Sequence, residues 1–335
     1  MGVHRRFPMR EPSQVGEARR AAVHLAEQAG FGETAAGRVA LVATELGNNL
    51  VRHAAQGELL IACLADGDEH CIEILSVDAG PGMAAVDTCL QDGYSTAGTP
   101  GTGLGAVRRL ADTFDVHSQV PGGTIVLARI GLHATAPPAT PPAPFLHGAV
   151  AVAAPGETVS GDAWSVASAG PRLAVMVADG LGHGPDAARA GEAALSAFGA
   201  APFDGPCRVL EQAHAAARGT RGAAAAMALL DAQARTVAFA GAGNVAGRLI
   251  SGVESRTLMS QHGTVGLQVR RLQEAACAWP EHAVLILHSD GIASRWELNQ
   301  VPGLLRRHPT VIAAWLLREH ERGRDDATIV VIRHV

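Results

Sequence analysis

The sequence contains no lysine, so all 27 of its basic residues other than histidine are arginines. This absence excludes a lysine-dependent phosphate-binding loop and any reaction that begins with a lysine Schiff base. Aromatic residues make up only 4% of the chain and charged residues 18%, against 47% hydrophobic residues, which is typical of a globular protein and not of a disordered one. The net charge of -5 argues against electrostatic capture of nucleic acid.

Cysteine and long apolar runs are also scarce. The five cysteines are odd in number and form no Cys-x-x-Cys pair, so we expect free thiols in a reducing cytoplasm rather than zinc ligands or disulfides. The amino-terminal residues lack the apolar core of a signal peptide, and no run approaches the ~18 apolar residues of a membrane-spanning helix. We therefore expect a cytoplasmic protein with no membrane partner. A chain of 335 residues has room for two domains, each with its own core.

Proline is concentrated in one segment, residues 133–144, which reads HATAPPATPPAP. Such a density of proline keeps a chain extended at ~3.1 Å per residue and makes it a semi-rigid spacer. Helix and strand patterns lie on both sides of this segment but not within it. The sequence therefore predicts a domain over residues 1–132, a linker over residues 133–144 and a second domain over residues 145–335.

Aspartates lie beside apolar runs at four places in the second half. One run ends in Asp179, another ends shortly before Asp290, Asp162 precedes a short alternating segment, and Asp325 lies just before a run near the carboxyl terminus. Each of these aspartates on its own is compatible with an ordinary turn. Together they offer the carboxylate oxygens that Mg²⁺ and Mn²⁺ prefer, and a pair of such ions can activate a water for attack on a phosphoryl group.

The segments that contain these aspartates, SGD, DGLGHG, SDG and DDAT, occur in this order. Together they resemble the metal-dependent protein phosphatase family, which has the protein phosphatase 2C fold, and specifically its SpoIIE-type, RsbX-like bacterial branch. The resemblance extends over residues 145–335. It implies that Asp179 is the central catalytic ligand, bridging two Mn²⁺ or Mg²⁺ ions, and that the backbone carbonyl of Gly180 helps to hold one of them.

The same resemblance implies the remaining ligands. Asp162 would help to bind the first metal ion through a water molecule, while Asp290 and Asp325 would complete the ligands of the second ion. Asp326 occupies a place where many relatives have asparagine, so the choice between Asp325 and Asp326 stays open. The arginine that binds phosphate in some eukaryotic relatives has no clear match here. The group that recognises the substrate phosphate is therefore unassigned.

The first half contains two features that could bind a nucleotide. A helix is predicted over residues 34–54, and Glu45 and Asn49 lie four residues apart on one face of it. That polar face is also compatible with a salt bridge from Glu45 to Arg38 or Arg52. Further along, GTGLG opens a short helix, where uncapped amides and the helix dipole can hold a phosphate, although such a string often only permits close packing.

Three segments together, TELGNNLVRHA, DAGPG and GTGLG, resemble the N box and the two glycine boxes of the GHKL ATPase superfamily, especially the RsbT- and RsbW-type switch serine kinases. The resemblance implies that Asn49 holds Mg²⁺ against the triphosphate of ATP and that Asp78 accepts a hydrogen bond from the adenine amino group. Glu45 would orient or deprotonate the attacking hydroxyl. The glycines would let the backbone approach the base and wrap the phosphates: Gly80, Gly82, Gly101, Gly103 and Gly105.

These resemblances imply an α+β chain, in which a GHKL-type (Bergerat) α/β sandwich is followed by a protein phosphatase 2C-like αββα antiparallel sandwich. They further imply a bacterial partner-switching regulator, a metal-dependent phosphoserine/phosphothreonine phosphatase fused to a serine kinase, with STAS-domain proteins as partners and substrates. The alternative is a phosphatase gated by an amino-terminal domain that binds ATP or a partner without kinase turnover. The length of the chain and its negative net charge disfavour an ATPase that acts in nucleic-acid topology or repair. The oligomeric state stays open.

Overall fold

The computed structural model describes residues 2–54, 56–66, 69–90, 103–132 and 144–335. Contacts divide the chain into two compact units, Gly2–Thr140 and Pro141–Val335. The fold is α+β, and the strands of every named pair run antiparallel. All five cysteines are free thiols. Within the described ranges, no helix combines the length and the apolar character that a membrane crossing requires.

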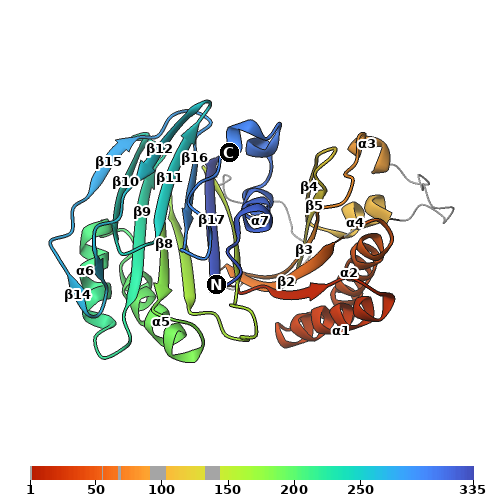
Figure 1. The fold of residues 1–335 in the computed structure, drawn as a ribbon, viewed down its shortest axis with the longest axis horizontal. Helices are drawn as coiled ribbons and strands as arrows, with labels where there is room; N and C mark the ends of the chain where they lie inside the picture. The colour runs from red at the N-terminus through yellow and green to blue at the C-terminus, as the bar shows by residue number, and fades with distance from the viewer. Residues whose placement is uncertain (1, 55, 67–68, 91–102, 133–143) are drawn as a thin grey trace. The chain divides into compact units, whose positions relative to one another are not determined.

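The first unit contains one five-stranded antiparallel sheet in the order β1-β2-β3-β5-β4 (Figure 1). The central strand is β3, and its last residue is Asp78. The loop that begins with Asp78 therefore starts at the end of the most enclosed strand of the sheet. The strands are β1 (Arg5–Pro8), β2 (Gly57–Asp66), β3 (Glu69–Asp78), β4 (Thr113–Ser118) and β5 (Thr124–Gly131).

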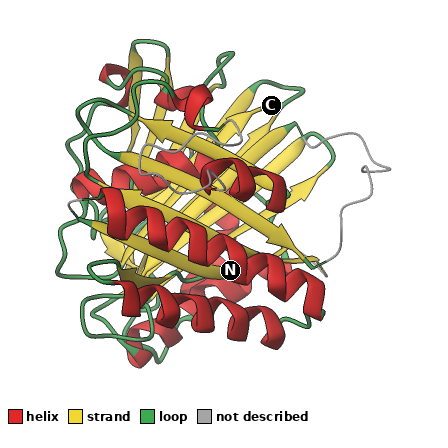
Figure 2. Cartoon of the chain, turned by 90° about the vertical axis from the view of Figure 1, so that its right-hand side faces the viewer, coloured by secondary structure: helices red, strands yellow, loops and turns green. Residues whose placement is uncertain are grey.

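Two long helices, α1 (Pro12–Gln28) and α2 (Glu33–His53), pack on each other and on β2 and β3. Figure 2 faces this unit and shows the two helices in front of the strands. The shorter helices are α3 (Val86–Cys89) and α4 (Gly103–Leu110), and α4 packs on α2. The core forms between the helices and the sheet, because α2 buries apolar residues at helical spacing: Val39, Val42, Leu46 and Leu50.

A buried ionic cluster joins the start of the first unit to its sheet. The side chain of Glu73, on β3, has no exposed surface, and its carboxylate lies 2.8 Å from Nε2 of His4 and 2.6 Å from Nε of Arg129. Burial by itself would raise the pKa of Glu73, but the charges and hydrogen bonds of Arg129 and His4 outweigh it and lower the pKa to about 2. Glu73 is therefore ionised at neutral pH.

Removing this charge in Glu73→Gln should lower the free energy of unfolding of the first unit by about 3 kcal/mol, because the largely buried Arg129 loses the charge of its fully buried partner. The ionised carboxylate stabilises the fold above its unfolded pKa of ~4.3, and this contribution is lost as the pH falls towards the folded pKa. The difference between wild type and variant should therefore shrink from about pH 4.5 downwards. Urea denaturation followed by far-UV circular dichroism measures the difference.

Glu58→Gln is the matched control, because Glu58 pairs with Arg6 at 3.1 Å in the same sheet but is partly exposed, and such pairs contribute only ~0–1 kcal/mol. Equal losses in the two variants would contradict the role assigned to burial. All four tryptophans lie in the second unit, so their fluorescence should be the same in both variants and wild type: Trp164, Trp279, Trp296 and Trp315.

The second unit is built on two five-stranded antiparallel sheets, ordered β15-β10-β9-β8-β7 and β12-β11-β16-β17-β6. The first sheet contains β7 (Asp162–Ala169), β8 (Arg172–Gly180), β9 (Ala223–Asp231), β10 (Thr236–Ala242) and β15 (Ala275–Ala278). The second contains β6 (Phe145–Val152), β11 (Ala246–Ser251), β12 (Glu254–Leu258), β16 (Val284–His288) and β17 (Ala327–His334). A separate two-stranded pair consists of β13 (Gly263–Thr264) and β14 (Gln268–Val269).

The two sheets pack face to face, and helices cover their outer faces (Figure 1). Helices α5 (Pro185–Ala200) and α6 (Pro206–Ala216) lie on the first sheet, and α7 (Pro309–His320) lies on the second. The expected αββα antiparallel sandwich is therefore confirmed. Its inner core contains side chains from both sheets, among them Phe145, Trp164, Val175, Phe239 and Leu285.

Helix α7 is not indicated by the periodicity of the sequence. Its residues 309–317 are all buried, so it has no polar face to produce a helical alternation. Local signals mark only its start, where Pro309 occupies the first turn and the side chain of His308 accepts a hydrogen bond from the amide of Thr310 at 3.1 Å. Two short 3₁₀ helices precede it, η1 (Leu298–Gln300) and η2 (Leu304–Arg306).

Candidate active sites

Four aspartates from the two sheets of the second unit converge at one end of the sandwich. Asp162 is the first residue of β7 and lies directly opposite Asp179 on β8. Asp290 follows β16, and Asp325 precedes β17, in the other sheet. The two sheets are joined at this point by the hydroxyl of Ser289, which donates to Oδ2 of Asp162 at 2.6 Å.

Negative charges surround the paired aspartates Asp162 and Asp179. Burial raises the pKa of Asp179 far above its usual range, and the negative charges of Asp162, Asp290 and Asp325 raise it further. Burial also raises the pKa of Asp162, to which the charges of Asp326 and Asp325 add. Such shifts arise where several anions are forced into one poorly solvated place, and they are typical of functional sites.

Two neutral side chains orient the aspartates, and sequence reasoning identified neither. Ser289 holds Asp162, and its own oxygen accepts a hydrogen bond from the amide of Thr328 at 3.0 Å. Asn244, in the turn between β10 and β11, donates to Oδ2 of Asp290 at 2.5 Å. Ser289 stands next to Asp290 in the SDG segment, whereas Asn244 lies 46 residues away and has no local signal.

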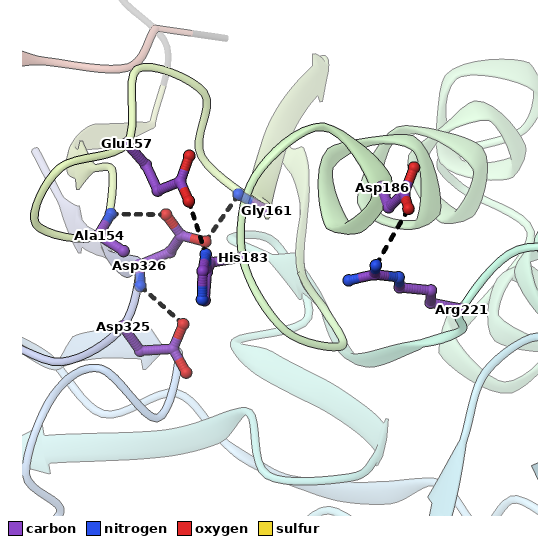
Figure 3. Close-up of polar contacts among 8 residues, drawn as sticks. All are labelled: Ala154, Glu157, Gly161, His183, Asp186, Arg221, Asp325 and Asp326. Atoms are coloured by element: carbon purple, nitrogen blue, oxygen red, sulfur yellow. Dashed lines mark hydrogen bonds and ion pairs between the residues drawn. The ribbon is translucent and has the colours of Figure 1, made fainter.

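Asp325 and Asp326 have different surroundings (Figure 3). Both oxygens of Asp326 accept backbone hydrogen bonds, from the amides of Ala154 and Gly161 at 2.8 Å each, and its side chain is buried. Asp325 is half-buried, and its negative charge acts on both Asp162 and Asp179. This arrangement favours Asp325 as the metal ligand and gives Asp326 the role of fixing the loop before β7.

Glycines in these segments are required by close packing. A Cβ on Gly180 would lie 2.0 Å from the carbonyl oxygen of Ala187 in α5, and a Cβ on Gly291 would lie 2.0 Å from the carbonyl oxygen of Asp326. No side chain fits at such distances, so the acidic segments can approach α5 and β17 only with glycine at these positions. The Asp-Gly pairs are therefore needed for assembly of the site as well as for turning the chain.

The donor set consists of oxygen atoms, which suits hard divalent cations. Among the described residues, no three His, Cys, Asp or Glu side chains are arranged as a ready cluster of metal ligands. Asp162 and Asp290 are instead hydrogen-bonded to Ser289 and Asn244. The case for a metal site rests on the shared position and mutual electrostatic influence of the four carboxylates.

Two histidines near the aspartates have different environments. His288 is buried, its Nδ1 is 2.8 Å from the carbonyl of Ser289, and its ring packs edge-on against Trp296. Burial lowers the pKa of His288, so this ring is neutral at pH 7 and its contacts are structural. His183 is exposed, and its Nδ1 lies 2.7 Å from Oε1 of Glu157 (Figure 3).

The two adjacent aspartates make a sharp test. Asp326→Ala should destabilise the second unit, by about 1–3 kcal/mol for each buried amide left unpaired. Asp325→Ala should leave stability nearly unchanged but weaken Mn²⁺ binding. Tryptophan fluorescence during urea denaturation measures the first effect, and calorimetric titration with Mn²⁺ measures the second. The assignment is wrong if Asp325→Ala binds Mn²⁺ as tightly as wild type while Asp326→Ala unfolds at the wild-type urea concentration.

In the first unit, helix α2 presents Glu45 and Asn49, both half-buried, on one face. Gly103, the first residue of α4, faces the Asn49 side chain, because a Cβ on Gly103 would lie 3.9 Å from both Oδ1 and Nδ2 of Asn49. The described part of the GTGLG segment therefore lies against α2, although about 54 residues separate Gly103 from Asn49 in the sequence. Gly105 is buried in α4, and Gly101 lies outside the described residues.

Asp78 and the glycines after it form a tightly packed loop. Oδ1 of Asp78 accepts a hydrogen bond from the amide of Gly80 at 2.7 Å. Gly82 has a positive φ of 76°, and a Cβ there would lie 2.0 Å from the carbonyl oxygen of Gln119. The loop thus packs against the β4–β5 turn, where the Ser118 hydroxyl accepts a hydrogen bond from the amide of Met83 at 2.7 Å.

The alternative of a salt bridge from Glu45 to Arg38 does not occur. Arg38 donates instead to the carbonyl of Leu110, at the end of α4, and pairs with Asp112 at 2.7 Å. Among the described residues, Glu45 has no ion pair with Arg52 either. Arg38 therefore joins α2 to the far end of the helix that begins with Gly103.

Two family models match the chain. The histidine kinase-like ATPase domain matches residues 9–130, and Stage II sporulation protein E (SpoIIE) matches residues 169–335. The fold and these two matches together define a protein that joins a GHKL-type ATPase domain to a protein phosphatase 2C-type domain.

The chain is also similar to individual proteins and solved structures. The serine/threonine-protein kinase RsbT of Bacillus subtilis (strain 168) is 33% identical over 111 residues, which cover 33% of this chain and 84% of RsbT. A solved structure from the bacterial stressosome, a modular system adapted to control secondary messenger signaling, is 28% identical with a TM-score of 0.53 and covers 56% of this chain and 99% of its own. RsbX in complex with magnesium has 20% identity and a TM-score of 0.49, over 57% of this chain and 96% of its own.

The chain therefore belongs, through its first unit, to the RsbT-type family of histidine kinase-like ATPase domains, and its second unit is a SpoIIE-type phosphatase domain.

Proposed function

We propose that this chain dephosphorylates phosphoserine or phosphothreonine in STAS-domain proteins through its second unit and phosphorylates serine in such proteins through its first. The phosphatase half rests on one observation, the convergence of carboxylates from both sheets, in which Asp162 lies opposite Asp179 and is hydrogen-bonded to Ser289, the neighbour of Asp290. The likeness to RsbT and to a stressosome structure supports the partner-switching context. We assign the kinase to residues 1–132 and the phosphatase to residues 145–335, joined by the linker 133–144, most of which lies outside the described residues.

In the phosphatase, Asp179 would bridge two Mn²⁺ or Mg²⁺ ions, with the carbonyl of Gly180 on one of them and Asp162, Asp290 and Asp325 as further ligands. Bound ions of this kind supply an activated water and neutralise charge on a phosphoryl group. The chain's own part is to hold the carboxylates in place. Ser289 and Asn244 do this by hydrogen bonds to two of them, which limits the reorganisation that binding requires.

Asp179→Asn should reduce Mn²⁺-dependent release of phosphate from a phosphorylated STAS protein by more than about a hundredfold, because it removes the central ligand. Without metal the same variant should be more stable than wild type at pH 8. The raised pKa of Asp179 means that its ionisation opposes folding, so stability falls as the pH rises towards that pKa, and asparagine removes the effect. Phosphate release and thermal unfolding are the two measurements.

Asp231→Asn is the matched control for this experiment. Asp231 is the residue of β9 farthest along the strand from the position that pairs with Asp179. Its carboxylate accepts hydrogen bonds from the amides of Gln233 and Ala234 in a turn. Its substitution should leave phosphatase activity unchanged. Normal turnover in Asp179→Asn would refute the metal assignment.

In the kinase, ATP would supply the phosphoryl group and this chain would position it. Asn49 would hold Mg²⁺ against the triphosphate, and Asp78 would accept from the adenine amino group. Glu45 would orient or deprotonate the serine hydroxyl, in a reaction where positioning and electrostatics dominate. The glycines would permit close approach of the backbone to ATP: Gly80, Gly82, Gly101, Gly103 and Gly105.

Two substitutions separate binding from transfer. Asp78→Asn should abolish binding of ATP with Mg²⁺, because Oδ1 already accepts from the amide of Gly80 and the substitution replaces Oδ2 with an NH₂ donor, which cannot accept from the adenine amino group. Glu45→Ala should leave ATP binding intact but abolish transfer of radioactive phosphate to a STAS protein. Calorimetry and the transfer assay on the full chain measure the two steps.

Equal ATP binding by wild type and Asp78→Asn would show that the adenine assignment is wrong. ATP binding by wild type with no transfer to a STAS protein would favour the alternative, in which the first unit gates the phosphatase without kinase turnover. Fusion raises the effective concentration of each module at a shared partner under either scheme.

A further inference from the structure

A cavity of about 520 Å³ lies beside the loop that follows Asp179 and Gly180, outside the carboxylate cluster. Two residues of α5 line one side of it, Asp186 and Arg189. The turn after α6 lines the other side with Gly219, Thr220 and Arg221. Arginine is therefore present on both walls of a single cavity.

Backbone contacts place this cavity at the same end of the sheet as the catalytic carboxylates. The amide of Leu181 donates to the carbonyl of Gly222 at 2.9 Å, and Gly180 is paired with Ala223 on β9. Nη1 of Arg221 lies 3.3 Å from the position that a Cβ on Gly182 would occupy. Arg221 thus reaches the loop that begins at the proposed metal ligands.

A single carboxylate holds both guanidinium groups. Oδ1 of Asp186 is 2.6 Å from Nη2 of Arg189, and Oδ2 is 3.0 Å from Nη2 of Arg221 (Figure 3 draws the second pair). Two positive charges against one negative charge leave the cavity with a net charge of about +1. A guanidinium has five N–H donors, so each arginine can bind a further anionic group while Asp186 keeps it in place.

The wall of the cavity is held in position by its own hydrogen bonds. The hydroxyl of Thr220 donates to the carbonyl of Ala217 at 2.7 Å and accepts from the amide of Gly222 at 3.0 Å.

Two exposed leucines also lie next to Gly222. Leu181 is 40% exposed, and Leu267, 58% exposed, has its Cγ 2.9 Å from the position that a Cβ on Gly222 would take. A positive cavity bordered by apolar side chains suits a protein segment rather than a free ion.

We propose that Arg189 and Arg221 bind an acidic side chain of the phosphorylated protein, close in sequence to its phosphoserine or phosphothreonine, while Leu181 and Leu267 contact neighbouring apolar residues. The inference rests on the proposed phosphatase function. In Figure 3, the Asp186–Arg221 pair lies apart from the group that contains His183, Asp325 and Asp326. The arginines therefore recognise a residue beside the phosphorylated one, and the phosphoryl group itself reaches the aspartates.

The test compares phosphoserine peptides that differ at one flanking position, which is Glu, Gln or Lys. Wild-type full-length protein with Mn²⁺ should prefer the Glu peptide over the Gln peptide by about tenfold in kcat/KM, mainly through KM, which is the effect expected of charge-assisted hydrogen bonds. Arg221→Glu and Arg189→Glu should lose this preference, and the double variant should prefer the Lys peptide. This inversion is not expected from a merely structural role.

Arg208→Glu is the matched control, because Arg208, on α6, is also exposed and pairs with an aspartate, Asp204, which lies just before that helix. It should keep the wild-type preference. The proposal is overturned if wild type does not distinguish the Glu and Gln peptides, if the double variant keeps the preference for Glu, or if Arg208→Glu changes the preference as much as Arg221→Glu does.

A binding measurement keeps this proposal separate from the proposed function. Fluorescence titration of the same peptides into Asp179→Asn protein, with and without Arg221→Glu, measures recognition without turnover. Tighter binding of the Glu peptide that depends on Arg221 supports the cavity even if no peptide is hydrolysed, which would contradict only the phosphatase assignment. Equal binding of all three peptides overturns the cavity assignment even if hydrolysis is normal.

Discussion

The main physical constraint on the second unit is the crowding of carboxylates where its two sheets meet. Asp162 and Asp179 are paired across neighbouring strands, and the charges of Asp290 and Asp325 reach Asp179 from the other sheet. Such an arrangement opposes folding, because carboxylates lose solvation and repel one another. It persists because the sheets and helices around it bury large apolar surfaces. A divalent cation is the group that would relieve the repulsion, which is why we interpret this end of the sandwich as a metal site.

The two units show opposite uses of a buried carboxylate. Glu73 is surrounded by His4 and Arg129, its pKa is lowered, and its charge stabilises the first unit. Asp179 has anions around it and its pKa is raised, so a bound cation would favour its ionisation. The two pKa shifts have opposite directions because the charges around the two carboxylates have opposite signs. The contacts of Asp326 are structural, because both of its carboxylate oxygens accept hydrogen bonds from backbone amides.

Around the acidic centre, charge changes sign over a short distance. Arg189 and Arg221 lie on the helix and the turn next to the loop that leaves Asp179. An acidic centre that binds cations and a basic cavity beside it would together suit a substrate that carries both a phosphate and a neighbouring acidic side chain. In the first unit, α2 plays the comparable organising role, since it carries Glu45 and Asn49 and contacts the helix that begins with Gly103.

The sequence alone determined the fold class, the family of each half and the order of the acidic segments, because each of these is written in short contiguous motifs and in apolar periodicity. The metal roles of these aspartates, and the roles of Gly101 and the linker, stay predictions. Only the tertiary structure distinguished Asp325 from Asp326 and revealed Asn244 and Arg221, because their roles come from contacts with residues distant in sequence. Helix α7 escaped prediction for a related reason: it is buried on all sides, so its pattern contains no polar face.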